Sequence, residues 1–169
     1  METERTILSL LEEKDLTDMT TMAGEPDTFR YLKKLRVMTG EEYQRFLRVK
    51  LEQIRLKTGY HWAVWLKDRG DFIGAANLNP IGETKRLQIG CQLKRQYWGQ
   101  GFASELTRRV LEFAIEEAGL KEVYGVFEKE NIISRRLLEK LGFVWIEDMV
   151  QLEVEVEVHR YTPPAVPSV

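Results

Sequence analysis

One segment constrains the fold of this chain more than any other. A strand-like run at Arg86–Leu93 passes through Gln96-Tyr-Trp-Gly-Gln-Gly101 directly into residues 102–118, the strongest helical pattern in the sequence, which Gly119 ends. Two glycines at a strand-to-helix junction let the backbone approach a ligand closely, and the first amides of a helix have no partner within it. The junction therefore suits an anion, most naturally a phosphate or pyrophosphate, although a helix start also needs flexible residues for purely structural reasons.

The rest of the chain mixes strand-like and helix-like patterns. The sequence predicts strands at residues 6–11, 61–66, 72–78, 86–93, 123–127 and 153–159. It predicts helices at residues 12–22, 43–54, 102–118 and 131–141. Thr39 suits the start of the second helix, Gly142 supplies a left-handed cap after the last one, and an extended run resumes at Phe143. The mixture indicates an α+β fold with helices on both faces of a sheet.

Length and composition bound the class of protein. With 169 residues, 25 basic against 27 acidic, the chain suits one domain at residues 1–162, followed by a proline-rich tail at 163–169 that we expect to be disordered. The balanced charge argues against a dedicated nucleic-acid binder. A single cysteine and the lack of a long apolar run or signal core favour a soluble, cytoplasmic protein with no membrane partner.

Two common nucleotide-binding motifs do not fit the glycine-containing junction. A dinucleotide fingerprint needs a third glycine three residues after the second, but Phe102-Ala103-Ser104 follow Gly101. A P-loop needs Gly-Lys-Ser/Thr, which is absent there. Both of these nucleotide-binding motifs are therefore disfavoured.

A second distinctive stretch lies at residues 130–143, with the sequence ENIISRRLLEKLGF. Together, Q-x-x-G-x-G opening one helix and N-x-x-S-x-x-x-L-E-K-L-G-F after the next strand resemble the GNAT superfamily of acetyl-CoA-dependent N-acetyltransferases. The form YWGQGFASE is similar to the Rim-type branch, which contains ribosomal-protein N-terminal acetyltransferases. The specific motifs lie between Gly90 and Phe143, while the order of elements agrees over the chain to about Tyr161.

This resemblance implies a mixed, mostly antiparallel sheet of six or seven strands, with about four helices on both faces and a splayed centre. It implies acetyl-CoA as cosubstrate and no metal. The strand ending near Leu93 would be bulged and would pair with the pantetheine arm. The residues implied to hold the cofactor are Leu93, Gln96, Trp98, Gly99, Gln100, Gly101, Phe102, Ala103, Asn131, Ser134 and Arg136, with Arg135 as the alternative to Arg136 at the adenosine 3'-phosphate.

The family's reaction is direct attack of a neutral amine on the acetyl group, without an acyl-enzyme. The resemblance implies that the Ser134 hydroxyl lies near the thioester sulfur, as a general acid or hydrogen-bond donor. Related sequences often carry a glutamate at the position of Gln88, which itself cannot act as a base. Glu128 is the carboxylate expected to take the role of this base, and Glu130 is a second candidate. Glutamates are more commonly solvated surface groups.

The identity of the acceptor stays open among several amines. An α-amine is roughly a tenth neutral at pH 7, whereas a lysine needs about 4–5 kcal/mol to lose its proton, so a missing base favours a protein N-terminal α-amine. A polyamine, aminoglycoside or amino acid, or a non-catalytic acyl-CoA-binding domain, are the alternatives. The enzyme could act as a monomer or as a homodimer formed through the edge of residues 153–159, although a strand inside the sheet has the same alternating pattern.

Cysteine, histidine and aromatic residues elsewhere in the chain could have functional roles, but residues of these types are more often structural. Cys91 lacks a histidine partner at a recognisable spacing and suits a buried site, and His61 and His159 form no metal-ligand pattern. The aromatic residues of the strand at 60–62 could line an acceptor pocket or pack in the core, and Tyr97 and Trp98 could flank the cofactor.

Charge is distributed unevenly behind the balanced total. Basic residues gather around the glycine junction at Lys94, Arg95, Arg108 and Arg109, which suits a polyanionic cofactor. The acidic residues of the C-terminal stretch, which could attract a cationic amine or simply face solvent, are Glu147, Asp148, Glu153, Glu155 and Glu157.

Overall fold

A seven-stranded mixed sheet forms the centre of the computed structural model, which describes residues 1–151 and 153–164. The strands lie in the order β1-β2-β3-β4-β5-β7-β6, and every neighbouring pair is antiparallel except β4 and β5. Their bounds are β1 Thr6–Leu10, β2 Tyr60–Leu66, β3 Phe72–Pro80, β4 Leu87–Leu93, β5 Val123–Glu128, β6 Val144–Gln151 and β7 Val154–Tyr161. The mixed, mostly antiparallel sheet is confirmed; residues 165–169 of the expected tail lie outside the described residues.

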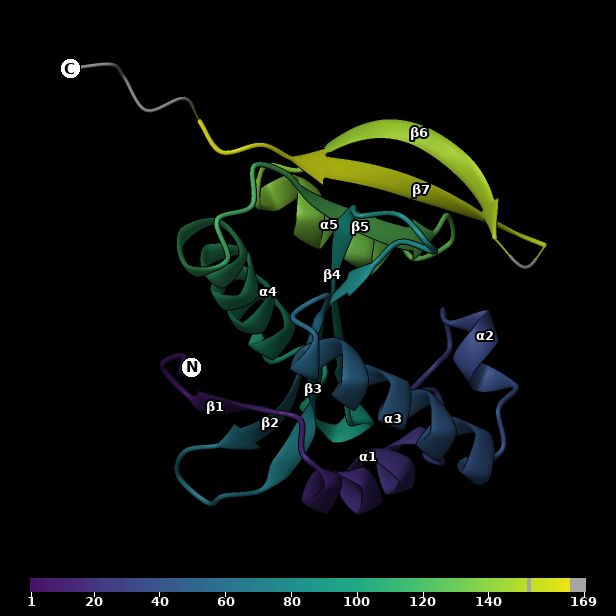
Figure 1. Cartoon of the computed structure of the whole chain (residues 1–169), viewed down its shortest axis with the longest axis vertical. Coiled ribbons are helices and arrows are strands. Elements are labelled where there is room, and N and C mark those ends of the chain that lie inside the picture. The colour runs from purple at the N-terminus through teal and green to yellow at the C-terminus, as the bar shows by residue number, and fades with distance from the viewer. Residues whose placement is uncertain (152, 165–169) are drawn as a thin grey trace.

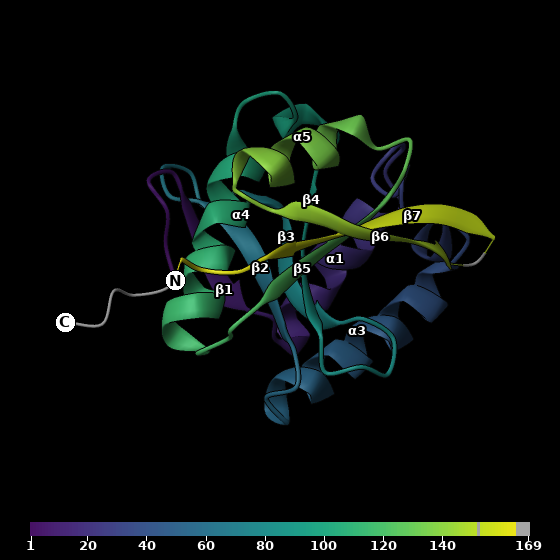
Figure 2. The ribbon, with the colours of Figure 1, turned by 90° about the horizontal axis from the view of Figure 1, so that it is seen from above.

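Helices cover both faces of this sheet, as expected (Figures 1 and 2). On one face, α1 (Leu16–Ala23) and α3 (Gly40–Arg55) pack on β2 and β3 around a core that includes Met19, Leu47 and Ala75. On the other face, α4 (Phe102–Glu112) and α5 (Ile132–Lys140) enclose the larger core. No helix of the described part is long and apolar enough to cross a membrane.

Several local signals have the structure that the sequence predicts. Thr39 caps α3 in a capping box: its hydroxyl accepts the Glu42 amide at 3.3 Å, and the Glu42 carboxylate accepts the Thr39 amide at 2.7 Å. Gly119 and Gly142 adopt left-handed conformations, with φ of 67° and 93°. The hairpin between β2 and β3 turns at Gly70, where φ is 68°.

The helices differ from the expectation in three places. The helix expected at residues 12–22 begins as a 3-10 turn, Glu13–Asp15, before α1. The helix expected at 102–118 ends in a π-helical turn at Phe113–Glu117. The short helix α2 (Lys33–Arg36) was not predicted, because four residues are too few to show a helical period.

The C-terminal strands form a hairpin beyond β5. Strand β7 lies between β5 and β6, so both of its edges are paired, and β6 is the outermost strand. The edge of residues 153–159 is therefore closed to a second chain, and the alternating pattern of this strand reflects its place inside the sheet.

Candidate active site

The sheet opens between its two parallel strands. The only register pair between β4 and β5 in the described part joins Gln88 to Tyr124, near the starts of both strands. No other register pair joins the two strands in the described part, so the edges of β4 after Gln88 and of β5 after Tyr124 are not paired with each other; this region is called the gap. This is the splayed centre that the resemblance implies. The expected bulge near Leu93 is not found: β4 pairs with β3 in unbroken register from Pro80↔Leu87 to Gly74↔Leu93.

The loop between β4 and α4 presents free backbone donors at this opening. Gly99 and Gly101 are both left-handed, with φ of 71° and 84°, a conformation that is costly for residues with a Cβ. In residues 1–151 and 153–164, no backbone amide of residues 99–104 donates a hydrogen bond. A run of unpartnered amides at the start of a helix suits a pyrophosphate, because the helix dipole adds positive potential there.

Arg5, which sequence reasoning missed, holds the loop from outside. Its guanidinium donates to the Gln100 carbonyl at 3.0 Å, lies 3.9 Å from the centre of the Phe102 ring, and pairs with Glu105 at 2.7 Å. The Gln100 side chain closes the loop by donating to the Gln96 carbonyl at 2.7 Å. Nothing in the local sequence could indicate the Arg5 contact, since it joins positions about a hundred residues apart.

The two remaining residues predicted on the β4 side contact each other. The Trp98 indole donates to the Leu93 carbonyl at 2.8 Å, and the Arg95 guanidinium lies 4.4 Å from the Trp98 ring centre. The Leu93 side chain is buried under α4. Trp98 thus fixes the end of β4 at the mouth of the opening, and the Leu93 carbonyl is already occupied by one donor.

The start of α5 brings Asn131 and Ser134 together. The Asn131 side chain caps the helix by accepting the Ser134 amide at 3.1 Å. The half-buried Ser134 hydroxyl has no hydrogen-bond partner among the described residues, so it is available to a ligand. Arg135 is held by Glu157, at 3.0 Å from Nε, and by the Lys129 carbonyl at 3.2 Å, whereas Arg136 is exposed and forms no ion pair in the described part.

The candidate carboxylates occupy different places. Glu128 ends β5, and its carboxylate accepts the Lys33 amide at the start of α2 at 3.1 Å. It therefore joins β5 to the segment beside the groove described below. Glu130 is exposed, and Gln88 lies on β4 at the narrow end of the opening.

A row of polar side chains crosses the sheet face that α1 and α3 cover, and sequence analysis did not identify it as a unit. His61 on β2 is opposite Asn77 on β3, and Asn77 is opposite Gly90 on β4. A Cβ at Gly90 would lie 2.7 Å from the Asn77 side chain, so only glycine leaves room for this amide. The pair Asn79 and Gln88 continues the row towards β5.

His61 is the least satisfied member of this row. It is 4% exposed, and neither ring nitrogen has a hydrogen-bond partner in the described structure. The side-chain oxygen Oδ1 of Asn79 is also buried and unpaired. Burial, together with the nearby positive charge of Lys50, lowers the pKa of His61 to about 3. The imidazole is therefore neutral at physiological pH and can both donate and accept.

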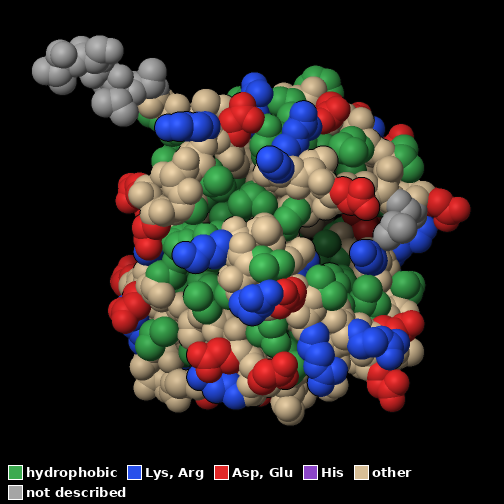
Figure 3. All heavy atoms as spheres, in the orientation of Figure 1, with side chains coloured by type: hydrophobic (Ala, Val, Ile, Leu, Met, Phe, Trp, Pro, Cys, Tyr) green, Lys and Arg blue, Asp and Glu red, His purple; other side chains and the backbone are tan. Residues whose placement is uncertain are grey.

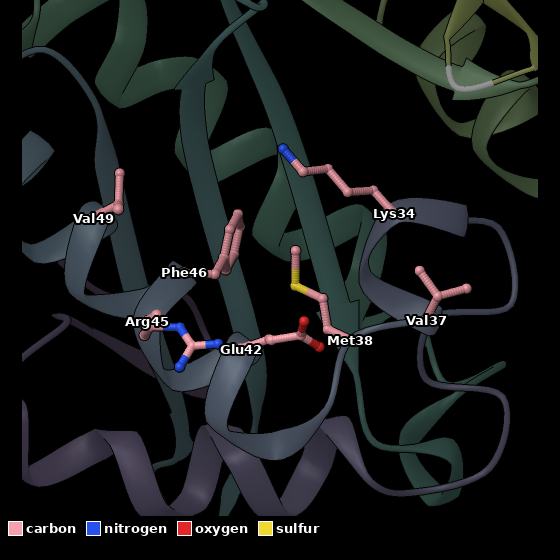
Figure 4. Close-up of a pocket in the computed structure, with 7 residues that line it drawn as sticks. All are labelled: Lys34, Val37, Met38, Glu42, Arg45, Phe46 and Val49. Atoms are coloured by element: carbon pink, nitrogen blue, oxygen red, sulfur yellow. The ribbon is translucent and has the colours of Figure 1, made fainter.

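A groove of about 460 Å³ lies between α2 and α3. Figure 4 shows Lys34 and Met38 reaching from the α2 side towards Phe46 on α3. Figure 3 shows the same face of the molecule hollowed next to α2, with hydrophobic side chains inside and charged ones on the rim. The residues lining the groove are Lys34, Val37, Met38, Glu42, Arg45, Phe46 and Val49.

The remaining candidate residues pack against their neighbours in the fold. Burial raises the pKa of the Cys91 thiol to about 12, which suits a packed side chain and not a nucleophile. Tyr60 and Trp62 stack at 5.8 Å and pack edge-on against Phe113 in the core, on the face opposite His61. Tyr97 is buried against Phe102, at a ring-centre distance of 6.1 Å.

The C-terminal acidic residues are paired with cations and do not form a free patch. Asp148 and Glu155 contact Lys129 at 2.8 and 3.5 Å, and Glu147 contacts Arg86 at 3.3 Å. Glu157 pairs with Arg135, and Glu153 lies 3.5 Å from Lys33. These contacts support the solvated-face explanation of the acidic stretch over attraction of a cationic amine.

The donor residues fit a coenzyme A moiety. The free amides of residues 99–104 match a pyrophosphate, and Arg108 is exposed, with no ion pair in the described part. The opened edges of β4 and β5 can pair with an amide-containing arm. The described residues contain no group of three or more His, Cys, Asp or Glu that could hold a metal ion.

Comparison with known proteins identifies the class. Residues 5–144 match the family model described as an acetyltransferase (GNAT) domain. The chain therefore belongs to the GNAT acetyltransferases and is an N-acetyltransferase. An uncharacterized N-acetyltransferase, YoaA of Bacillus subtilis, is 25% identical over 144 residues, which cover 85% of this chain and 81% of that protein.

Two solved structures share the fold at low identity. The first is RimL, described as a ribosomal L7/L12 alpha-N-protein acetyltransferase in complex with coenzyme A; it is 14% identical with a TM-score of 0.82 and covers 95% of each chain. The second is spermidine N-acetyltransferase from Vibrio cholerae in complex with CoA and spermine, which is 19% identical with a TM-score of 0.78. The match covers 93% of this chain and 95% of that one. The neighbours thus include protein and polyamine acetyltransferases.

Proposed function

We propose that this enzyme transfers the acetyl group of acetyl-CoA to a protein or peptide N-terminal α-amine. The observation that carries the donor half is the run of unpartnered amides at residues 99–104, beside the gap between β4 and β5. In the proposed complex, Gly99 to Ala103 hold the pyrophosphate, Leu93, Gln96 and Trp98 shape the loop, Asn131 contacts the pantetheine arm, and Arg136 binds the 3'-phosphate.

Bound acetyl-CoA supplies an activated acyl group. The protein must orient it, accept a proton from the amine and protonate the leaving thiolate. The free Ser134 hydroxyl at the start of α5 supports a role as proton donor to that sulfur. Glu128 is the proposed base, acting through water, because its carboxylate ends β5 and retains acceptor capacity beyond its contact with Lys33.

An α-amine is the acceptor that the residues near the gap support best. The family's common glutamate position is Gln88, which cannot take a proton, and Glu128 is already engaged by one amide. An amine with a pKa near 7.7–8.0 needs less help to become neutral than a lysine or a polyamine amine near 10.4. The RimL neighbour is named as an α-N-protein acetyltransferase.

A small-molecule amine is the second candidate, and the spermidine acetyltransferase neighbour is the observation in its favour. The groove between α2 and α3 opposes a polycation, since Lys34 and Arg45 line it.

Release of free thiol from acetyl-CoA, measured over N-terminal peptides, spermidine, an aminoglycoside and free amino acids, separates these functions. We expect turnover with peptides, and mass spectrometry should find the acetyl group on the α-amine. Turnover confined to a small amine would replace the proposed acceptor. Stabilisation by acetyl-CoA without turnover of any amine would show a binding domain.

A further inference from the structure

The groove between α2 and α3 contains an excess of positive charge that the fold does not neutralise. Lys34 and Arg45 line it, and neither forms an ion pair with a carboxylate in residues 1–151 and 153–164. Glu42 also lines the groove; its carboxylate accepts the Thr39 amide at 2.7 Å and offsets one of these two positive charges, so the lining keeps a net positive charge.

Lys50 extends this positive charge inward. Its ammonium lies 4.8 Å from the centre of the Phe46 ring, which itself lines the groove, and 3.2 Å from the Gln53 carbonyl oxygen. Lys50 is half-buried and forms no ion pair with any described carboxylate. Burial and the positive charge of Lys34 lower the pKa of Lys50.

A contact between α2 and β5 links the groove to the gap in the sheet. The Glu128 carboxylate at the end of β5 accepts the Lys33 amide at 3.1 Å, and Lys34, the next residue, lines the groove. The groove therefore begins beside the end of β5, one of the two strands that border the gap.

We infer that the groove and Lys50 form an acceptor subsite for a carboxylate, so that the enzyme selects N-terminal peptides with an acidic residue a few positions from the α-amine. This inference rests on the proposed function, which places the reacting amine at the gap between β4 and β5.

The occupant follows from charge and solvation. A half-buried ammonium is stabilised by a carboxylate, and hydrogen bonds to charged groups are stronger than neutral ones. Met38 and Phe46 give the groove an apolar wall for the aliphatic part of a side chain. A polyamine would bring further positive charge to Lys34 and Lys50.

Three peptides that differ in one side chain test this subsite. They carry Glu, Gln or Lys at the fourth position and are otherwise identical and uncharged beyond the α-amine. We expect kcat/KM to be about tenfold higher for the Glu peptide than for the Gln peptide, and lower again for the Lys peptide. Equal values for the three peptides, with turnover present, would overturn the subsite and leave the proposed function standing.

Variants assign the preference to the two lysines. Lys50→Met keeps an unbranched side chain beside Phe46, and we expect it to reduce the Glu/Gln ratio to about one while the Gln peptide reacts as before. Lys34→Glu, at an exposed position, should favour the Lys peptide even if Lys50→Met fails to fold. The matched control is Lys140→Glu, which makes the same charge change as Lys34→Glu at an exposed lysine at the end of α5, on the opposite side of the sheet.

The failure of the subsite and that of the proposed function give different results. A shift of preference towards the Lys peptide in Lys140→Glu as large as in Lys34→Glu would show a general charge effect and overturn the subsite. A wild-type enzyme that acetylates spermidine faster than every peptide would overturn both. Unchanged thermal unfolding of each variant in acetyl-CoA, relative to wild type, keeps these results independent of the donor site.

Discussion

In the proposed reaction, the loop before α4 binds the donor and the groove between α2 and α3 binds part of the acceptor, but the two are built differently. The loop comes from consecutive residues, and its unpartnered groups are backbone amides in a segment that contains the left-handed Gly99 and Gly101. The groove is assembled from separate elements, and its chemistry comes from side chains such as Lys34 and Phe46. A shared cosubstrate needs only the backbone, whereas the acceptor of each enzyme needs its own side chains.

The largest expected effect is a loss of kcat from a substitution at the donor side that leaves the loop before α4 unchanged. Ser134→Ala removes a hydroxyl that has no partner among the described residues, so the fold should be unaffected. We expect kcat to fall about 100-fold, as for loss of a general acid, with little change in acetyl-CoA affinity. Steady-state kinetics and calorimetric titration measure the two quantities.

Ser9→Ala is the control for this change. Its hydroxyl accepts the Trp65 indole at 3.2 Å, far from the gap, so it should lower stability slightly and leave kcat as in wild type. If Ser134→Ala has the kcat of wild type, Ser134 does not take part in the chemical step.

The second prediction concerns the acceptor side and pH. The folded pKa of His61 is depressed to about 3, so the unfolded chain binds a proton more readily, and stability is lost as pH falls from about 6.5 towards 3. Between pH 7 and pH 5, wild type should lose about 2 kcal/mol more of its unfolding free energy than His61→Leu does. Urea unfolding of both proteins at the two pH values measures the difference. Equal losses would mean that His61 is protonated in the folded protein.

The third prediction tests whether the donor side depends on backbone conformation. Gly101→Ala places a Cβ at φ 84°, and the loop should relax away from its left-handed shape, raising the Kd of acetyl-CoA about tenfold. Gly70→Ala is a matched control, because φ there is 68° and a Cβ would meet nothing within 4 Å. The two variants should lose similar stability, about 1 kcal/mol, while only the first loses affinity. Equal affinities of the two variants for acetyl-CoA would show that the backbone at Gly101 does not contribute to binding it.

The smallest expected effect is at Arg5, which touches the loop from outside. Arg5→Ala removes the hydrogen bond to Gln100 and the contact with Phe102, and should weaken acetyl-CoA binding about threefold through a more mobile loop. The control is Arg55→Ala, which breaks an exposed pair with Glu52 of similar geometry on α3. A drop in affinity in both variants would indicate a general loss of positive charge.

The sequence predicts the local structure of the loop before α4 and of α5 well, because its signals are local. Gly101 at a helix start, Asn131 as a cap and Gly142 after α5 each act on their own neighbours, and the fold class follows from the order of strands and helices. The resemblance to the GNAT superfamily is carried by these same residues, and the family match over residues 5–144 confirms it.

The acceptor side depends on contacts between distant positions, which no local pattern encodes. Glu128 meets the start of α2 across 95 positions in the chain, and four residues are too short to be recognised as a helix. His61, Asn77 and Gly90 become neighbours only through strand register. Arg5 lies outside any motif, yet it holds the loop that the motif predicts.

Hydrogen exchange at the amides of residues 99–104, with and without acetyl-CoA, tests the account most directly. These amides donate no hydrogen bond within the described residues, so they should exchange rapidly in the free protein. We predict that saturating acetyl-CoA slows their exchange at least tenfold, as expected of amides bound to phosphate oxygens, while the hairpin turn at Gly70 is unaffected. Unchanged exchange at residues 99–104 under saturating acetyl-CoA would contradict the account.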